Sequence, residues 1–342
     1  PVYARCGGCD LQHLDDATQV RAKSEAVVET LRRLGGVQAL PEAFEVLPGQ
    51  PWGYRTRTQL HTERTDRGVQ VGFFARGSHD LVPVESCPVL VPELDAELRS
   101  LPRRLRDRET PPQRLDLAAG DGGAWTVSPP QPTLPQGEIV STVGERSYEW
   151  DARTFFQGHR QLVETLVDRV LGDPEAADPD AVAYDLYAGV GLFAVPLADR
   201  YAKVVAIEGD RVAARFARKN ARRAGSTNIE IETHMLESWI EQLPKHVERV
   251  VVDPPRTGLS DRVRRTLIAR RPRWLTYVSC NPSTLARDLR ELLARYRIDS
   301  ISLLDLFPQT GHMETLVQLM LKDHEPAVGP VSRDETYAEA DA

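Results

Sequence analysis

The hydrophobic positions of the chain follow one pattern before Asp151 and another after it. Between residues 44 and about 150, short runs such as 57–61 and 69–74 alternate apolar and polar residues and are broken by turn residues. Such alternation predicts short, half-buried β-strands. After Asp151, very apolar runs alternate with amphipathic stretches. These apolar runs are 181–186, 204–207, 249–252, 275–278, 301–304 and 316–321.

Near-continuous apolar runs of this length are typical of strands that are buried on both faces of a parallel sheet. Their alternation with helical segments predicts an α/β, Rossmann-like domain over residues 151–324. The run 316–321 follows its predecessor through a loop without a helix. We therefore expect this last strand to pair antiparallel to its neighbours.

The rest of the chain divides by composition and periodicity. Helical spacing of apolar residues predicts helices at about 18–34, which Gly35-Gly36 ends, at 94–105 and at 284–296. We expect three parts besides the Rossmann-like domain. They are a cysteine-bearing segment with a helix (1–43), a β-rich domain (44–150) and a disordered polar tail (325–342).

Charge and composition describe an ordinary globular protein of 342 residues with a net charge of -7. No stretch approaches the ~18 consecutive apolar residues that a membrane span needs, so we expect no membrane association. Net negative charge argues against nucleic acid, but binding depends on where cations lie. Arginines cluster in 103–108 and 262–273, and each run fits either an RNA-binding patch or a solvated helix face. The four unevenly spaced cysteines favour a reducing cytoplasm.

A glycine-containing loop follows the first strand of the Rossmann-like domain. Gly189 and Gly191 lie in a G-x-G-x-x-A pattern, where the absence of a Cβ lets the backbone turn tightly and approach a ligand. Glu208 ends the next strand and can accept hydrogen bonds from two ribose hydroxyls. Both a nicotinamide dinucleotide and S-adenosylmethionine fit this pattern. The lead-in Asp185-x-Tyr187 is more typical of adenosylmethionine enzymes.

Two further strands end in residues that can carry chemistry. Asp253 is followed by Pro254-Pro255, which resembles the loop that amino-directed methyltransferases use to hold a flat base. An exocyclic-amine methylase is therefore a competing interpretation, and a helix-capping Asp is another. Cys280 ends the next strand, and Ser283 is a credible N-cap of the helix that follows. The positive end of that helix dipole predicts a lowered thiol pKa, whereas a buried, inert cysteine is the alternative.

Glu314 precedes the last strand and reaches the same sheet edge as Cys280. The combination points to one reaction, because uracil C5 is a poor nucleophile. A thiolate that adds to C6 turns the ring into an enolate, and C5 can then attack a methyl sulfonium. The adduct must afterwards lose its C5 proton so that the thiol can leave. This reaction needs a thiol, a base and a methyl donor, whereas an amine methylase needs no thiol.

These motifs resemble those of the RNA uracil-C5 methyltransferase family, whose members act on a uridine of ribosomal or transfer RNA. The matching stretches are 155–157, 185–191, 253–256, 279–282 and 310–314. The resemblance implies that S-adenosylmethionine is the methyl donor, Cys280 the nucleophile and Glu314 the base. The residues that it places at the cofactor are Gln157, Tyr187, Gly189, Gly191, Glu208 and Asp253. Leu192 and Met235 stand where the family often has asparagine.

The N-terminal Cys6-Gly7-Gly8-Cys9 is similar to the cysteine segment of family members that carry a [4Fe–4S] cluster. The resemblance implies that Cys6, Cys9 and Cys87 are three ligands of this metal group. Four thiolates are needed, and we expect the fourth just before Pro1. Zinc and an empty site are the alternatives.

We therefore expect RNA as the partner, with no obligate protein partner and no membrane. Two rival classes stay open. One is another nucleotide-cofactor enzyme, such as a nicotinamide oxidoreductase or an amine methylase. The other is a non-catalytic RNA-binding or iron–sulfur protein.

Overall fold

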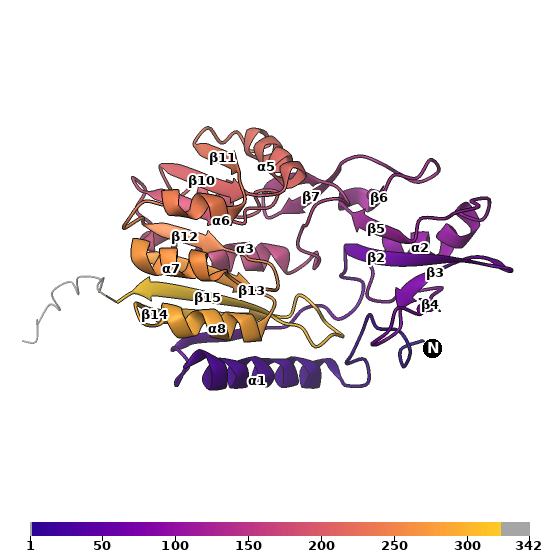
Figure 1. Ribbon diagram of the computed structural model, residues 1–342, viewed down its shortest axis with the longest axis horizontal. Coiled ribbons are helices and arrows are strands. Elements are labelled where there is room, and N and C mark those ends of the chain that lie inside the picture. Colours follow the sequence, from indigo (N-terminus) through magenta and orange to yellow (C-terminus); the bar gives the residue numbers. More distant parts are fainter. Residues whose placement is uncertain (1, 323–342) are drawn as a thin grey trace, which may run out of the picture.

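The computed structural model describes residues 2–322, which build two bodies side by side (Figure 1). The larger body contains an eight-stranded sheet. Its strands are, from edge to edge, β1 (Ala43–Leu47), β14 (Tyr296–Leu304), β15 (Glu314–Leu321), β13 (Trp274–Ser279), β12 (Arg249–Val252), β9 (Val182–Leu186), β10 (Lys203–Glu208) and β11 (Ile229–Thr233). All neighbours pair parallel except β15, which is antiparallel to both β13 and β14.

Helices cover both faces of this sheet and bury two separate apolar clusters against it. One face packs against α1 (Asp16–Gly35), α6 (Leu236–Trp239), α7 (Asp261–Arg270) and α8 (Pro282–Leu292). The other packs against α3 (Val163–Leu171), α4 (Ala194–Leu197), α5 (Arg211–Arg223) and the hairpin β7 (Ile139–Val143)–β8 (Arg146–Trp150). The result is the three-layer architecture of an open α/β sheet.

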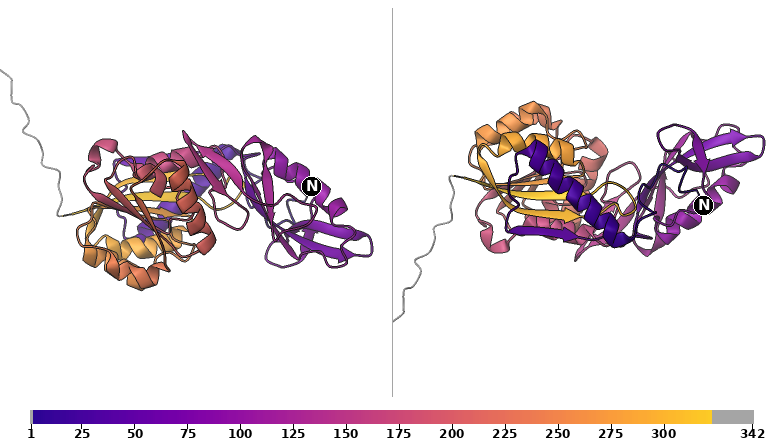
Figure 2. Two further views of the ribbon diagram at one scale, coloured as in Figure 1. Left: turned by 90° about the horizontal axis from the view of Figure 1, so that it is seen from above. Right: turned by 90° about the horizontal axis from the view of Figure 1, so that it is seen from below.

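Helix α1 is far from α8 in sequence but packs directly against it, and Figure 2 shows α1 crossing one face of the sheet. Asp15 caps its N-terminus by accepting a hydrogen bond from the Thr18 N–H at 2.9 Å. Gly36 ends it in the left-handed region with φ 72°. A Cβ on Gly35 would lie 3.3 Å from the Ala286 Cα, so the glycine permits the close approach of the two helices.

The smaller body is a five-stranded antiparallel sheet with one helix. Its order is β4 (Leu81–Pro83), β3 (Gly68–Phe74), β2 (Arg57–Thr65), β5 (Arg114–Ala119) and β6 (Trp125–Ser128). Helix α2 (Pro92–Arg104) covers one sheet face and completes an apolar core. Three 3₁₀ turns, η1 (Asp121–Gly123), η2 (Pro174–Ala176) and η3 (Ile240–Gln242), complete the described elements. In Figure 1 the arrowheads of β12 and β13, in the larger body, point toward the smaller body.

The α/β fold and all six predicted strands are confirmed, including the antiparallel last strand. The two strands that the sequence did not reveal, β1 and β11, are the sheet edges. The boundary expected at residue 44 is wrong for β1, because this strand pairs with β14 and not with the five-stranded sheet. The helix predicted to reach Tyr296 ends at Leu292, since Tyr296 already pairs with Leu321.

No helix within residues 2–322 is long and apolar enough to span a membrane. The helices predicted at 18–34 and 94–105 are present as α1 and α2. The tail expected at 325–342 lies outside the described residues.

Candidate active site

The antiparallel register of β13 and β15 brings Cys280 and Glu314 together. Ser279 pairs with Thr315 as the last pair of this ladder, and Cys280 and Glu314 each directly adjoin that pair. The charge of Glu314 raises the pKa of Cys280, so the two side chains lie within electrostatic reach of each other. Glu314 is only 3% exposed, while Cys280 is half-buried. The predicted thiol and the predicted base are therefore neighbours where β13 ends and β15 begins.

The surroundings of Cys280 do not favour a free thiolate. Burial raises the pKa of Cys280 to about 11, and the negative charges of Glu314 and Asp253 act in the same direction. Only Arg256 lowers this pKa, through its charge and a hydrogen bond. The expected lowering by the helix dipole is therefore wrong, because desolvation and two carboxylates outweigh it. The N-cap of α8 is Asn281 and not Ser283, whose N–H donates to the Asn281 side chain at 3.1 Å.

Three carboxyl groups gather at the ends of β9, β12 and β15, of which Asp185 and Glu314 are buried and Asp253 is half-buried. Burial raises the pKa of Asp185 to about 8 and that of Asp253 to about 7, and Asp253 itself raises the pKa of Asp185. The pKa of Glu314 lies well above its ordinary value, chiefly because the side chain is buried and also because Asp253 is near. Gln157 lowers the Asp253 pKa by a hydrogen bond, so the Gln157 amide also reaches this edge. A cation that binds beside these three carboxyl groups would lower their pKa values and favour their ionised forms.

The glycine loop between β9 and α4 has the backbone conformation that the sequence implied. Tyr187, Gly189 and Gly191 all lie in the left-handed region, with φ 69°, 56° and 87°. The Gly189 N–H donates to Glu208 Oε2 at 2.7 Å, and the Asp210 N–H donates to Glu208 Oε1 at 2.6 Å. The loop thus fixes the Glu208 carboxylate beside the first glycine. An added Cβ on Gly189 would point into open space, which leaves room for a ligand.

Orphaned polar atoms support a cofactor in this crevice. Within the described residues, both carboxylate oxygens of Asp185 and Oε1 of Gln157 are buried without a hydrogen-bond partner. Buried polar atoms are normally paired, so the unpaired atoms of this crevice are available to the polar groups of a ligand. Three acidic groups and an open glycine loop fit a nucleoside that carries a positive centre, which is the chemistry of S-adenosylmethionine. A sulfonium cofactor would supply an activated methyl group here.

Two departures from the family pattern lie on either side of this loop. Leu192 is buried in the apolar cluster beneath α4 and α5. Met235 is 65% exposed and lies beside Gly209, since a Cβ on that glycine would be 2.8 Å from its sulfur. No separate role for Arg256 was predicted from the sequence, although the charge of this arginine acts on the Cys280 thiol. Its place directly after Asp253-Pro254-Pro255 was the available signal.

The N-terminal cysteines line a separate cavity of about 100 Å³ together with Arg55. Cys6, Cys9 and Cys87 also influence one another electrostatically. Burial raises the pKa of Cys87 to about 11 and that of Cys9 above its ordinary value, while Arg55 opposes both shifts. Among residues 2–322, no three His, Cys, Asp or Glu side chains are close enough together to hold a metal ion.

The doubly wound sheet, the glycine turn with its fixed carboxylate and the acids at the strand ends define a class I, S-adenosylmethionine-dependent methyltransferase domain. A family model described as tRNA (uracil-5-)-methyltransferase matches residues 140–322. The chain belongs to this family of RNA uracil-C5 methyltransferases.

Individual relatives agree with this assignment. A 23S rRNA (uracil(1939)-C(5))-methyltransferase RlmD of Salmonella choleraesuis is 32% identical, over 93% of this chain and 80% of the relative. An uncharacterized RNA methyltransferase of Bacillus cereus is 29% identical over 94% of this chain and 83% of its own. The crystal structure of Pyrococcus abyssi tRNA (uracil-54, C5)-methyltransferase with S-adenosyl-L-homocysteine superimposes with a TM-score of 0.73. It is 26% identical and covers 92% of this chain and 86% of its own.

Proposed function

We propose that this enzyme forms 5-methyluridine in ribosomal or transfer RNA by way of a covalent bond between Cys280 and uracil C6. The observation that carries the proposal is that Cys280 and Glu314 adjoin the last pair of the β13–β15 ladder, where the charge of Glu314 acts on the thiol. The curated relatives named RlmD act on 23S rRNA and the structural relative acts on tRNA. Ribosomal RNA is the first substrate to test, since the 23S rRNA enzymes share more of the sequence.

In the proposed reaction, the Cys280 thiol loses its proton and the thiolate adds to C6. Arg256 offsets part of the cost of forming the thiolate. C5 then takes the methyl group that the cofactor supplies. Glu314 accepts the C5 proton, the C5–C6 double bond re-forms and the sulfur leaves as thiolate. The target base must leave its stack, because both C5 and C6 have to be reached.

Incubation with 5-fluorouridine-containing RNA and labelled S-adenosylmethionine tests the proposal, because fluorine cannot be removed as a proton. We expect a labelled, denaturation-stable complex of protein and RNA with the natural chain and none with Cys280→Ala. An amine methylase or an oxidoreductase would form no such complex. Methyl transfer by Cys280→Ala at the natural rate would refute the mechanism.

We further propose that RNA lies along the open face of the five-stranded sheet. Along β2, Thr58 and Leu60 are buried, whereas Gln59 is exposed and Arg57 and His61 are half-buried on the alternate side of the strand. The open face also carries an aromatic pair, since His61 stacks on Phe74 with ring centroids 3.6 Å apart. Aromatic rings and arginines on an open sheet are features that bind unstacked nucleotides.

This face continues into the crevice. The Arg57 guanidinium lies 5.3 Å from the ring centroid of Phe155, which is 60% exposed and stands two residues before Gln157. The arginine runs of the sequence are weaker candidates. Arg104 pairs with Glu97, Arg262 with Glu241 and Arg273 with Glu248, and Arg264 is buried.

Filter binding with the target RNA at several salt concentrations tests this path. Arg57→Ala and His61→Ala should each weaken binding about tenfold while cofactor affinity stays unchanged. Arg262→Ala is the matched control, because this arginine lies on α7, outside the five-stranded sheet, and pairs with Glu241. Equal weakening by all three variants would contradict the assignment.

We also propose that Cys6, Cys9 and Cys87 are three ligands of a [4Fe–4S] cluster. The support is that all three thiols line one cavity, next to the half-buried cation Arg55, which favours the thiolate forms of Cys9 and Cys87. Such a group would be structural or RNA-facing, because methyl transfer moves no electron. Iron and sulfide analysis of anaerobically purified protein, with zinc measured in parallel, decides between the cluster and zinc. Cys9→Ser should lose the metal, and a metal-free natural protein would overturn the proposal.

A further inference from the structure

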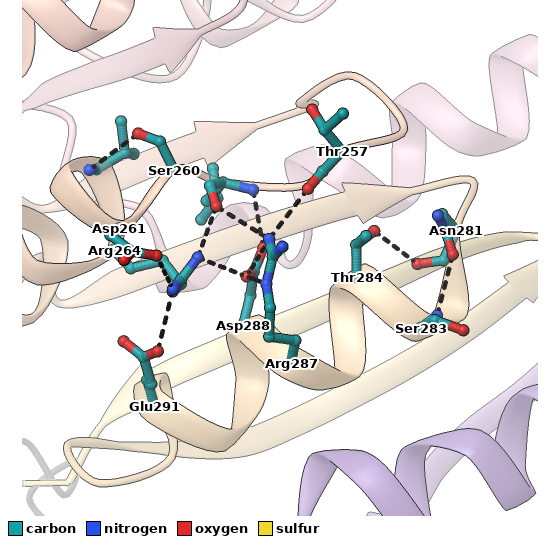
Figure 3. Close-up of polar contacts among 12 residues, drawn as sticks. Thr257, Ser260, Asp261, Arg264, Asn281, Ser283, Thr284, Arg287, Asp288 and Glu291 are labelled. Carbon is teal, nitrogen blue, oxygen red and sulfur yellow. Dashed lines mark hydrogen bonds and ion pairs between the residues drawn. The ribbon is translucent and has the colours of Figure 1, made fainter.

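A fully buried carboxylate, Asp288, lies on α8 beneath the loop that follows Pro255. Its oxygens accept four hydrogen bonds, and two of the donors are arginines, which converge on it in Figure 3. The donors are the Leu259 N–H (2.8 Å), the Tyr277 hydroxyl (2.7 Å), Arg264 Nη1 (3.1 Å) and Arg287 Nε (2.8 Å). Asp288 therefore joins β13, α7, α8 and the loop in one network.

Side chains of α8 and its N-cap fasten the loop 256–259 through its carbonyl oxygens, and one of them, Arg287, also bonds Asp288. The Arg256 carbonyl accepts hydrogen bonds from Asn281 Nδ2 at 3.0 Å and from Thr284 Oγ1 at 3.2 Å. Arg287 Nη2 donates to the carbonyls of Thr257 and Leu259, both at 3.0 Å. Because α8 begins directly after Cys280, these bonds fix the loop relative to the reactive thiol.

The loop matters because it carries the Arg256 guanidinium. Of the charged groups that face Cys280, Glu314 and Asp253 disfavour the thiolate, and only Arg256 stabilises it. The Arg256 side chain also contacts His312 Nε2 at 3.3 Å, and its charge lowers the pKa of Glu314. The position of this cation therefore depends on the backbone that Asp288 and its partners hold.

We infer that Asp288 is a positioning residue for methyl transfer, which acts by holding the loop 256–259 so that the Arg256 guanidinium stays beside the Cys280 thiol. This role rests on the proposed function, since it assumes that the thiolate is the reacting species. A residue that served stability alone would leave the ionisation of Cys280 unchanged in folded protein. A direct effect of removing the negative charge would favour the thiolate and so move its pKa down. Loss of the Arg256 position moves it up, so the direction of the shift identifies the cause.

The test is a double-mutant cycle on the full chain with Asp288→Asn, Arg256→Met and the double variant. The pH midpoint of iodoacetamide alkylation at Cys280 is read by peptide mass spectrometry, which separates it from the other cysteines. We expect each single variant to raise the midpoint by about half to one pH unit and the double variant to raise it no further than Arg256→Met. An unchanged midpoint in folded Asp288→Asn, a downward shift, or additive shifts in the double variant would overturn the inference.

Two further variants separate the proposed effect from a general loss of folding. Arg287→Gln removes the bonds to the loop carbonyls but leaves Asp288 and Arg264 in place, so it should raise the midpoint in the same direction by a smaller amount. Glu149→Gln removes another mostly buried carboxylate that pairs with Lys219 and Arg223 on the opposite sheet face. This control should leave the midpoint unchanged. Alkylation needs neither RNA nor cofactor, so its outcome is separable from the covalent-trapping test of the proposed function.

Discussion

The three carboxyl groups at the strand ends (Asp185, Asp253 and Glu314) and the carboxylate of Asp288 belong to the same domain but have opposite surroundings. At the sheet edge, both oxygens of Asp185 lack a partner within the described residues, and the pKa values of Asp253 and Glu314 are raised. Beneath the neighbouring loop, Asp288 is equally buried yet accepts four hydrogen bonds, two of them from arginines. Burial penalises a charge unless donors compensate for it. The edge acids are therefore suited to an incoming cation, whereas Asp288 is suited to holding the protein's own loop.

The largest effect should come from the edge group, at Glu314. Glu314→Gln keeps the size of the side chain but cannot accept the C5 proton, so the adduct cannot release its thiol. We expect turnover on unmodified RNA to fall about 10³-fold or more, while methylated covalent adduct accumulates. Denaturing gels with labelled cofactor measure both quantities. A slow variant without adduct would assign Glu314 to a step before methyl transfer.

The free energy of unfolding should change in opposite directions when Asp288 and Asp253 are replaced. Asp288→Asn leaves Arg264 buried with a weaker partner, so we expect the free energy of unfolding to fall by about 3 kcal/mol. Asp253→Asn removes an acid whose pKa is raised to about 7 in the folded state, so at pH 8 it should stabilise the cofactor-free protein by roughly 2 kcal/mol.

The stabilisation by Asp253→Asn should depend on pH. A carboxyl group with a raised folded-state pKa is neutral in both states below its unfolded value near 4. It destabilises the fold increasingly between pH 4 and 7 and fully above pH 7. The advantage of Asp253→Asn should therefore vanish at pH 4. Urea unfolding at the two pH values measures it, and a destabilised Asp253→Asn at pH 8 would contradict the contrast.

A smaller effect should appear in cofactor binding. S-adenosylmethionine carries a sulfonium charge that S-adenosyl-L-homocysteine lacks, and anionic edge acids favour only the former. As Asp253 ionises around pH 7, the affinity ratio of the two ligands should rise about tenfold between pH 6 and pH 8. Calorimetric titration with both ligands measures the ratio. In Asp253→Asn the rise should be smaller, and a flat ratio in the natural chain would count against the electrostatic assignment.

Features of the fold that depend on local sequence pattern could be predicted. All six inner strands were visible because both of their faces are buried and their residues are almost uniformly apolar. The edge strands β1 and β11 were missed, since one side of each is open and their sequences mix in charged residues such as Glu45 and Glu230. That Cys280 and Glu314 lie close together could be predicted because each adjoins a recognisable strand.

The surroundings of these residues could not be predicted from local pattern. The helix dipole suggested a lowered thiol pKa at Cys280, but the net shift depends on burial and on Glu314, Asp253 and Arg256, which come from three segments. In the sequence, Asp288 is one polar residue of an amphipathic segment. Its four donors come from different elements, and only the packed structure brings them together.

The smallest expected effect tests whether the donors around Asp288 are equivalent. Tyr277→Phe deletes one neutral donor, a hydroxyl 2.7 Å from the carboxylate, and leaves both arginines and the Leu259 N–H in place. We expect a loss of about 1 kcal/mol in the free energy of unfolding and no change in the alkylation midpoint of Cys280, because the loop stays fastened. Urea unfolding and alkylation of the same sample measure both. A midpoint that moved as far as in Asp288→Asn would mean that the hydroxyl, and not the arginines, orders the loop.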